Sequence, residues 1–84
     1  MTREDFSKAT QRYLNNGWII KSTNTYLSEK NEKDIVIEFG KWDDTNTMLK
    51  ALELSSVNGV RIKCTDTNWN YTEWNEYTNL TACL

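Results

Sequence analysis

Residues 48–64 read MLKALELSSVNGVRIKC, and they determine which fold class the chain can adopt. The first part of this stretch has high intrinsic helix propensity, so residues 47–57 could form a helix. The dipeptide Asn58-Gly59 is instead a strong hairpin signal. A hairpin requires strands on both sides of it, so we expect residues 47–57 to form a strand, with a helix as the alternative.

The register of this hairpin supports the strand interpretation. A three-residue loop over residues 57–59, with Gly59 in the left-handed conformation, fixes which residues face each other. The expected pairs are Ser56 with Val60, Leu54 with Ile62, Leu52 with Cys64, Glu53 with Lys63, and Lys50 with Asp66. This register places apolar side chains together on one face and opposite charges together on the other, as stable cross-strand pairing requires.

The chain before this stretch predicts one helix and two strands. Thr2 and Asp5 have the spacing of a short capping box, and Gly17 can end the helix in a left-handed conformation. Trp18 can then fold back on Tyr13. The β-branched residues of 18–27 and the alternation in 35–39 indicate two strands joined as a hairpin.

The last segment predicts a short helix. Tyr71, Trp74, Tyr77 and Leu80 recur every three residues, close to one helical face. The expected fold class is therefore α+β, with an N-terminal helix, a four-stranded antiparallel meander sheet and a short C-terminal helix over about residues 71–80. Helices covering one face of the sheet would give a two-layer core.

The length of 84 residues predicts a single domain over residues 1–84. The formal net charge of −2 is far from that of a protein that holds duplex DNA by neutralising phosphates. No apolar run is long enough for a membrane span, and the N-terminus has no apolar signal region, so we expect a cytoplasmic protein without membrane contact. Cys64 and Cys83 could form a disulfide, but reduced thiols are the expected state in that compartment.

The residues needed for catalysis are scarce. The chain has no histidine, which removes the usual general base and the commonest metal ligand. The adjacent acids Asp43 and Asp44 lie beside Thr and Asn, a combination typical of turns. We therefore expect no enzyme activity, no cofactor and no metal site.

One region has an unusual composition. Residues 64–84 contain three acidic side chains and no Lys or Arg, whereas residues 1–63 contain ten basic side chains. Trp and Tyr dominate protein-interface hot spots, and local acidity steers a basic partner. The candidate partner-binding residues are Asp66, Trp69, Tyr71, Glu73, Trp74, Glu76 and Tyr77. The other interpretation is that Trp74 and Tyr77 pack the last segment onto the sheet as core residues.

A resemblance adds to this interpretation. A capped N-terminal helix that closes on Leu14-Asn15-Asn16-Gly17-Trp18 and leads into a hairpin resembles small accessory proteins of phages and mobile elements. This group includes anti-CRISPR proteins and other host-defence inhibitors. The resemblance covers residues 1–40 and carries over no binding residue. It implies a partner that binds nucleic acid, whose basic groove an acidic patch could occupy.

The sequence thus favours a non-enzymatic protein-binding module with an acidic aromatic surface. The resemblance implies a phage-type inhibitor that blocks a nucleic-acid-binding host protein through this surface. The alternative is a single-stranded nucleic-acid-binding domain in which sheet aromatics stack on bases. The basic residues for that role would be Lys21, Lys41, Arg61 and Lys63. This alternative is less favoured because the aromatic-rich end is acidic. The edges of an open sheet could also pair two copies into a homodimer.

Overall fold

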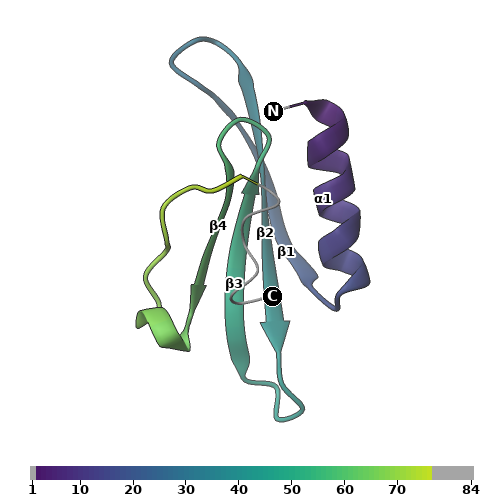
Figure 1. Cartoon of the computed structure of the whole chain (residues 1–84), viewed down its shortest axis with the longest axis vertical. Coiled ribbons are helices and arrows are strands. Elements are labelled where there is room, and N and C mark those ends of the chain that lie inside the picture. Colours follow the sequence, from purple (N-terminus) through teal and green to yellow (C-terminus); the bar gives the residue numbers. More distant parts are fainter. Residues whose placement is uncertain (1, 77–84) are drawn as a thin grey trace.

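The structure is a computed structural model, and it describes residues 2–76 (Figure 1). Its elements follow in the order α1 (Arg3–Asn15), β1 (Ile19–Leu27), β2 (Lys33–Trp42), β3 (Met48–Ser55), β4 (Gly59–Cys64) and the 3-10 turn η1 (Thr65–Thr67). The strands form one sheet in the order β1-β2-β3-β4, and every neighbouring pair is antiparallel. The predicted α+β class with a four-stranded meander is confirmed.

Helix α1 begins and ends as the sequence predicts. The backbone N–H of Asp5 donates to the Thr2 hydroxyl at 3.1 Å, and the Thr2 N–H donates to the Asp5 carboxylate. At the other end Gly17 has a φ of 88°, and the Trp18 N–H donates to the Tyr13 carbonyl at 3.1 Å. This closure turns the chain back onto the helix and brings the Trp18 ring edge-on to Tyr13.

The core lies between α1 and one face of the sheet. Tyr13 packs edge-on against Phe39, with 5.7 Å between the ring centroids. The buried core residues are Ala9, Tyr13, Trp18, Ile37, Phe39, Leu52, Leu54, Val60 and Ile62. Because side chains alternate along a strand, the residues between these apolar positions point to the opposite face of the sheet. Cys64 is also buried, as its predicted place on the core side of β4 requires.

The hairpin from β3 to β4 has a different register from the predicted one. The observed pairs are Ser55 with Gly59, Leu54 with Val60, Glu53 with Arg61, Leu52 with Ile62, Ala51 with Lys63, and Lys50 with Cys64. The loop is therefore residues 56–58 rather than 57–59, and the whole pairing is shifted by two residues. A shift of two leaves every side chain on its expected face, so the strand prediction holds while the partners change.

The buried Ser55 hydroxyl explains the loop position. It accepts hydrogen bonds from the backbone N–H groups of Val57 (3.2 Å) and Asn58 (2.9 Å) and donates to the Asp34 carboxylate at 2.6 Å. These bonds fix the turn immediately after Ser55, and Gly59 takes the positive φ of 104° where the second strand starts. The glycine was visible in the sequence pattern, whereas the hydrogen bonds of the Ser55 hydroxyl could not be predicted from it.

The prediction of a helix over residues 71–80 is wrong for its described part. Residues 71–76 run as an extended segment beside β4, visible as the yellow-green trace in Figure 1. Asn75 and Val60 exchange backbone hydrogen bonds of 2.8 and 2.9 Å, and the Thr72 N–H donates to the Ile62 carbonyl at 2.9 Å. The outer edge of β4 needs partners for its backbone groups, and this need outweighs the helical spacing of the aromatics. Residues 77–80 lie outside the described part of the chain.

Within residues 2–76, no helix has the length and apolar character needed to cross a membrane.

Candidate functional site

The face of the sheet opposite α1 carries a row of charges. Glu38 on β2 and Glu53 on β3 are directly opposite each other in the register. Each has a cation on its outer side: Lys21 Nζ lies 3.1 Å from Glu38, and Arg61 Nη2 lies 2.7 Å from Glu53. The row therefore runs from a cation at one edge of the sheet to a cation at the other, with the two carboxylates between them.

Two predicted site aromatics pack against the β4 end of this row. The Arg61 guanidinium carbon lies 4.5 Å from the ring centroid of Tyr71 and 4.5 Å from that of Trp74. Lys63 Nζ lies 4.6 Å from the Tyr71 ring. Cations at these distances are attracted by the ring quadrupoles. Tyr71 and Trp74 are thus half-buried and hold the 71–76 segment on β4, rather than forming a free aromatic surface.

The Tyr71 hydroxyl is buried close to the charged row. Among the described residues it has no hydrogen-bond partner of good geometry. Burial, followed by the nearby Glu53 and Glu38 carboxylates, raises the pKa of this phenol above its usual value. The hydroxyl therefore stays protonated at neutral pH and is not available as a general base.

Trp69 occupies a different environment. Its side chain is 38% exposed, and its backbone has a φ of 62°, next to Asn68 at 54°. Positive φ is unusual for any residue with a Cβ and is an outlier for a bulky one. Hydrogen bonds from the Trp69 N–H to the Cys64 carbonyl (3.2 Å) and from the Asn70 N–H to the Thr67 carbonyl (3.1 Å) hold the turn. The fold thus keeps a strained backbone conformation that presents this indole to solvent.

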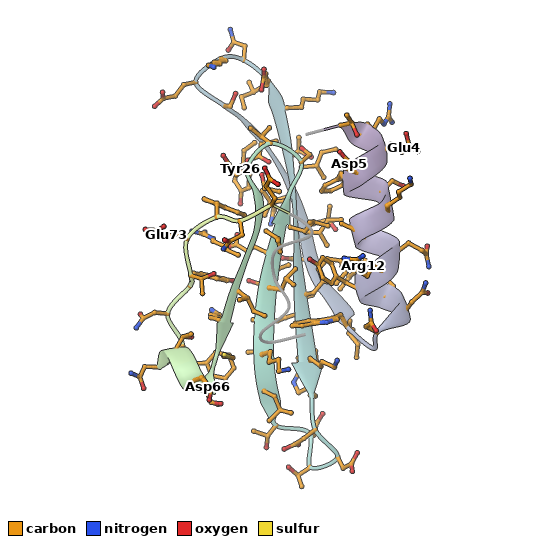
Figure 2. All side chains as sticks on the ribbon, in the orientation of Figure 1. Glu4, Asp5, Arg12, Tyr26, Asp66 and Glu73 are labelled. Atoms are coloured by element: carbon orange, nitrogen blue, oxygen red, sulfur yellow. The ribbon has the colours of Figure 1, made fainter. Side chains whose placement is uncertain are left out.

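The three carboxylates of the segment are also on the outside. Asp66, Glu73 and Glu76 are exposed, and residues 64–76 contain no Lys or Arg. Figure 2 shows Asp66 on the η1 turn and Glu73 on the extended segment, with the Glu73 side chain directed away from the sheet. The outer side of the chain after β4 is therefore acidic. We call the exposed side chains of Asp66, Trp69, Glu73 and Glu76 the acidic rim.

The structure thus divides the seven predicted site residues. It brings the four of the acidic rim to the outer side of the segment that follows β4. It packs Tyr71 and Trp74 on Arg61, and Tyr77 lies outside the described residues. The sequence analysis missed the role of Arg61 as the side chain that holds both rings. Its place on β4 opposite Glu53 was the available signal, but the predicted register assigned Lys63 to that position.

The basic residues considered for nucleic-acid binding do not share one face. Lys41 lies on the α1 side of the sheet, with its Nζ 5.5 Å from the Trp18 ring. On the other face, Lys21 and Arg61 are in ion pairs and Lys63 lies over Tyr71. Four cations with such partners on two faces do not form the continuous basic groove that single-stranded nucleic acid requires.

The acidic turn between β2 and β3 has a structural role. One oxygen of the Asp43 carboxylate accepts hydrogen bonds from the Thr45 hydroxyl (2.7 Å), the Thr45 N–H (2.9 Å) and the Thr47 N–H (3.0 Å). The Thr45 hydroxyl bond, more than the others, lowers the pKa of this carboxyl. Asp43 therefore acts as a turn former, as its sequence context suggested. Within residues 2–76, no group of three or more Cys, Asp or Glu side chains is placed to hold a metal ion.

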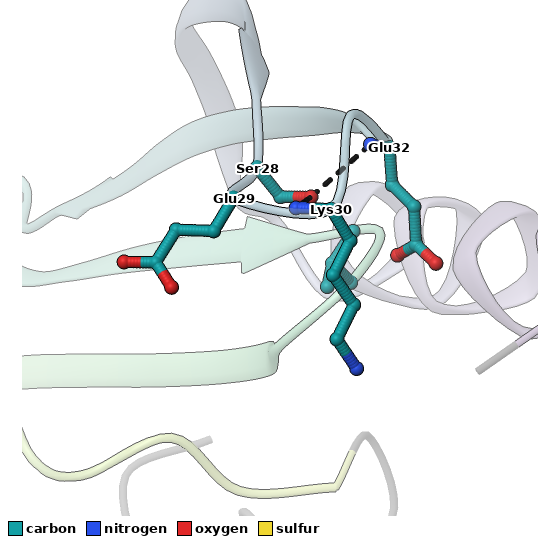
Figure 3. A pocket seen from close by; sticks show the side chains of 5 residues that line it. Ser28, Glu29, Lys30 and Glu32 are labelled. Carbon is teal, nitrogen blue, oxygen red and sulfur yellow. Dashed lines mark hydrogen bonds between the residues drawn. The ribbon is translucent and has the colours of Figure 1, made fainter.

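A shallow hollow at the turn between β1 and β2 shows no feature of a binding site. Ser28, Glu29, Lys30, Glu32 and Val57 line it. The Ser28 hydroxyl accepts hydrogen bonds from the backbone N–H groups of Lys30 and Glu32, which is ordinary turn geometry. The Glu29 and Glu32 carboxylates point apart (Figure 3), so they do not form an acid pair.

Comparisons with known protein families, with curated proteins and with solved structures give no match to this chain.

Proposed function

We propose that this chain is a non-enzymatic protein-binding module that engages a basic protein surface through the acidic rim. The observation that carries the proposal is the exposed Trp69 ring on a strained backbone. Residues with an unfavourable φ persist only where the surrounding structure holds them, and they cluster at ligand-binding and other functional sites. In a turn that binds no partner, glycine at this position would be more stable than tryptophan, because glycine adopts a positive φ without strain.

The chemistry of the acidic rim defines the partner. An exposed indole on a segment whose exposed charged side chains are the carboxylates of Asp66, Glu73 and Glu76 suits a surface that offers an apolar pocket and nearby Lys or Arg. The groove of a nucleic-acid-binding protein has this character. The proposed role is therefore that of a small inhibitor that occupies such a groove, as the resemblance to phage accessory proteins implies.

The test compares capture of proteins from a lysate of the native host by the wild type and by Trp69→Ala, quantified by mass spectrometry. We expect a nucleic-acid-binding protein to be retained by the wild type and to be lost at least about tenfold with Trp69→Ala, the effect of truncating an interface hot spot. Glu73→Lys should weaken the same partner, and rising salt should weaken it further because exposed charges are screened. Leu49→Ala is the matched control, because Leu49 is also 38% exposed but lies on β3.

Two further measurements decide whether the ring binds a partner or only supports the fold. Trp69→Gly relieves the positive φ and should leave the free energy of unfolding unchanged or raise it by about 1 kcal/mol, while abolishing capture. Unfolding of the domain by this variant would contradict the proposal, since the ring would then be a core residue. Equal capture by the wild type, Trp69→Ala and Leu49→Ala would contradict it as well.

A further inference from the structure

Strand β1 forms an outer edge of the sheet that is open to solvent. Within residues 2–76 it pairs only with β2, so its outward backbone groups have no neighbouring strand. All nine of its residues are exposed. Proteins usually protect long edge strands with proline, several charges or a covering segment, and this strand carries only one charge, Lys21.

The exposed apolar side chains of β1 are arranged symmetrically. Ile19 (58% exposed) and Ile20 (42%) lie at one end, and Tyr26 (55%) and Leu27 (72%) lie at the other. The five residues between them are polar, and Thr23 is the middle residue of the strand. The pattern of apolar and polar residues is therefore the same in both directions along the strand.

We propose that a second copy of this chain pairs with β1 in antiparallel orientation, with a two-fold axis at Thr23. Because the irregularity at Lys21 adds one residue to β1, this pairing places Tyr26 of each copy opposite Ile19 of the other, on the face away from α1. Leu27 then lies diagonal to Ile20 of the other copy on the α1 face, so both apolar ends are covered at once. A two-fold interface requires a surface that is complementary to itself, and the symmetric pattern supplies one. The two sheets then continue as one, joined by backbone hydrogen bonds.

The charge on β1 is compatible with this pairing. Lys21 lies at an irregularity between Ile20 and Ser22, where the register to β2 shifts. Its ammonium group is already paired with Glu38 of the same sheet at 3.1 Å. With the axis at Thr23, the Lys21 residues of the two copies lie on opposite sides of the axis, so no like charges face each other. A peptide of unrelated sequence could form the same backbone bonds, but only a second copy matches the side-chain pattern by symmetry.

The test uses charge at the axis. Thr23 is exposed, and in the proposed dimer it lies opposite Thr23 of the second copy. Thr23→Lys or Thr23→Glu therefore places two like charges directly opposite each other. We expect the wild type to dimerise with rising concentration in sedimentation equilibrium, from about 5 µM to about 500 µM, the range of weak association. Each variant alone should raise the dissociation constant at least about tenfold, and an equimolar mixture of the two should recover the dimer. Ser7→Lys, on the exposed side of α1, is the control with the same added charge.

Each outcome decides the proposal. A wild type that stays monomeric over this range overturns it, as does a Thr23→Lys protein that dimerises like the wild type. Dimerisation of each variant alone with no gain on mixing points to another interface and also overturns it. Amide hydrogen exchange of the wild type needs no substitution: protection confined to residues 19–27 that grows with concentration supports the pairing, and unchanged exchange there contradicts it. The result is independent of the proposed function, because the acidic rim follows β4, at the other edge of the sheet.

Discussion

The two outermost strands of the sheet, β1 and β4, differ in how the chain treats them. Both carry an isoleucine on the α1 face, yet Ile20 on β1 is 42% exposed and Ile62 on β4 is 2% exposed. Both also carry a cation on the opposite face that is paired with a glutamate of the neighbouring strand. The strands thus have similar side chains at matching places and very different surroundings.

The backbone edges of the two strands differ as well, because the 71–76 segment lies along β4. It supplies backbone hydrogen bonds to Val60 and Ile62, and it places two aromatic rings on Arg61. No described residue does the same for β1. The comparison indicates that the contribution of an edge-strand side chain to the free energy of unfolding depends less on the residue type than on what covers the strand.

The largest expected effect comes from truncating the two isoleucines. Ile62→Ala should lower the free energy of unfolding by about 3 kcal/mol, because it leaves a cavity in the core, whereas Ile20→Ala should cost less than about 1 kcal/mol. Urea unfolding of both proteins at a concentration below self-association measures the difference. If Ile62→Ala does not fold, Ile62→Val should still cost about 1 kcal/mol. Equal losses for Ile62→Ala and Ile20→Ala would show that the two edges are equivalent.

The next effect comes from the two ion pairs. Arg61→Ala removes the partner of the half-buried Glu53 carboxylate and both ring contacts, and it should cost about 2 kcal/mol. Lys21→Ala removes a more exposed pair and should cost under about 1 kcal/mol. Chemical unfolding at low and high salt checks both values, since salt should reduce the Lys21 effect more. Arg61→Lys should fall between, because a lysine cannot match the planar contact with two rings.

The smallest effect concerns the Tyr71 hydroxyl. Its pKa is raised in the folded state, mainly by burial, so folding favours the protonated phenol. The resulting stability is fully present below the pKa of the unfolded phenol, about 10, and is lost as the pH rises further. Tyr71→Phe should therefore change the free energy of unfolding little at pH 7 and make its alkaline decline shallower. Tyr13, whose pKa burial also raises, keeps part of the decline in the variant. An identical alkaline decline in both proteins would contradict this account.

The sequence predicted the elements whose signals are local. The capping box at Thr2, the glycine closure before Trp18 and the Asn58-Gly59 hairpin signal all act within a few residues, and the structure confirms each element. The exposure of Trp69 was also predictable from its polar neighbours. Its positive φ was not, because that conformation depends on hydrogen bonds of the whole turn.

The two errors both came from contacts between distant parts of the chain. Glu53 meets a cation in the predicted register (Lys63) and in the observed one (Arg61), so charge pairing alone could not choose between them. The choice depends on the Ser55 hydroxyl and on the rings that hold Arg61. The spacing of Tyr71 and Trp74 predicted a helix, but the unsatisfied edge of β4 is a stronger determinant, and it lies ten or more residues away in the sequence.

The backbone exchange between Val60 and Asn75 has a consequence for how many molecules can join. A sheet with two open edges can add copies on both sides and grow into a fibre without limit. Here the chain's own 71–76 segment occupies the β4 edge, so one edge of the described sheet, that of β1, remains open to another copy. The pairing proposed for β1 would therefore end at two molecules.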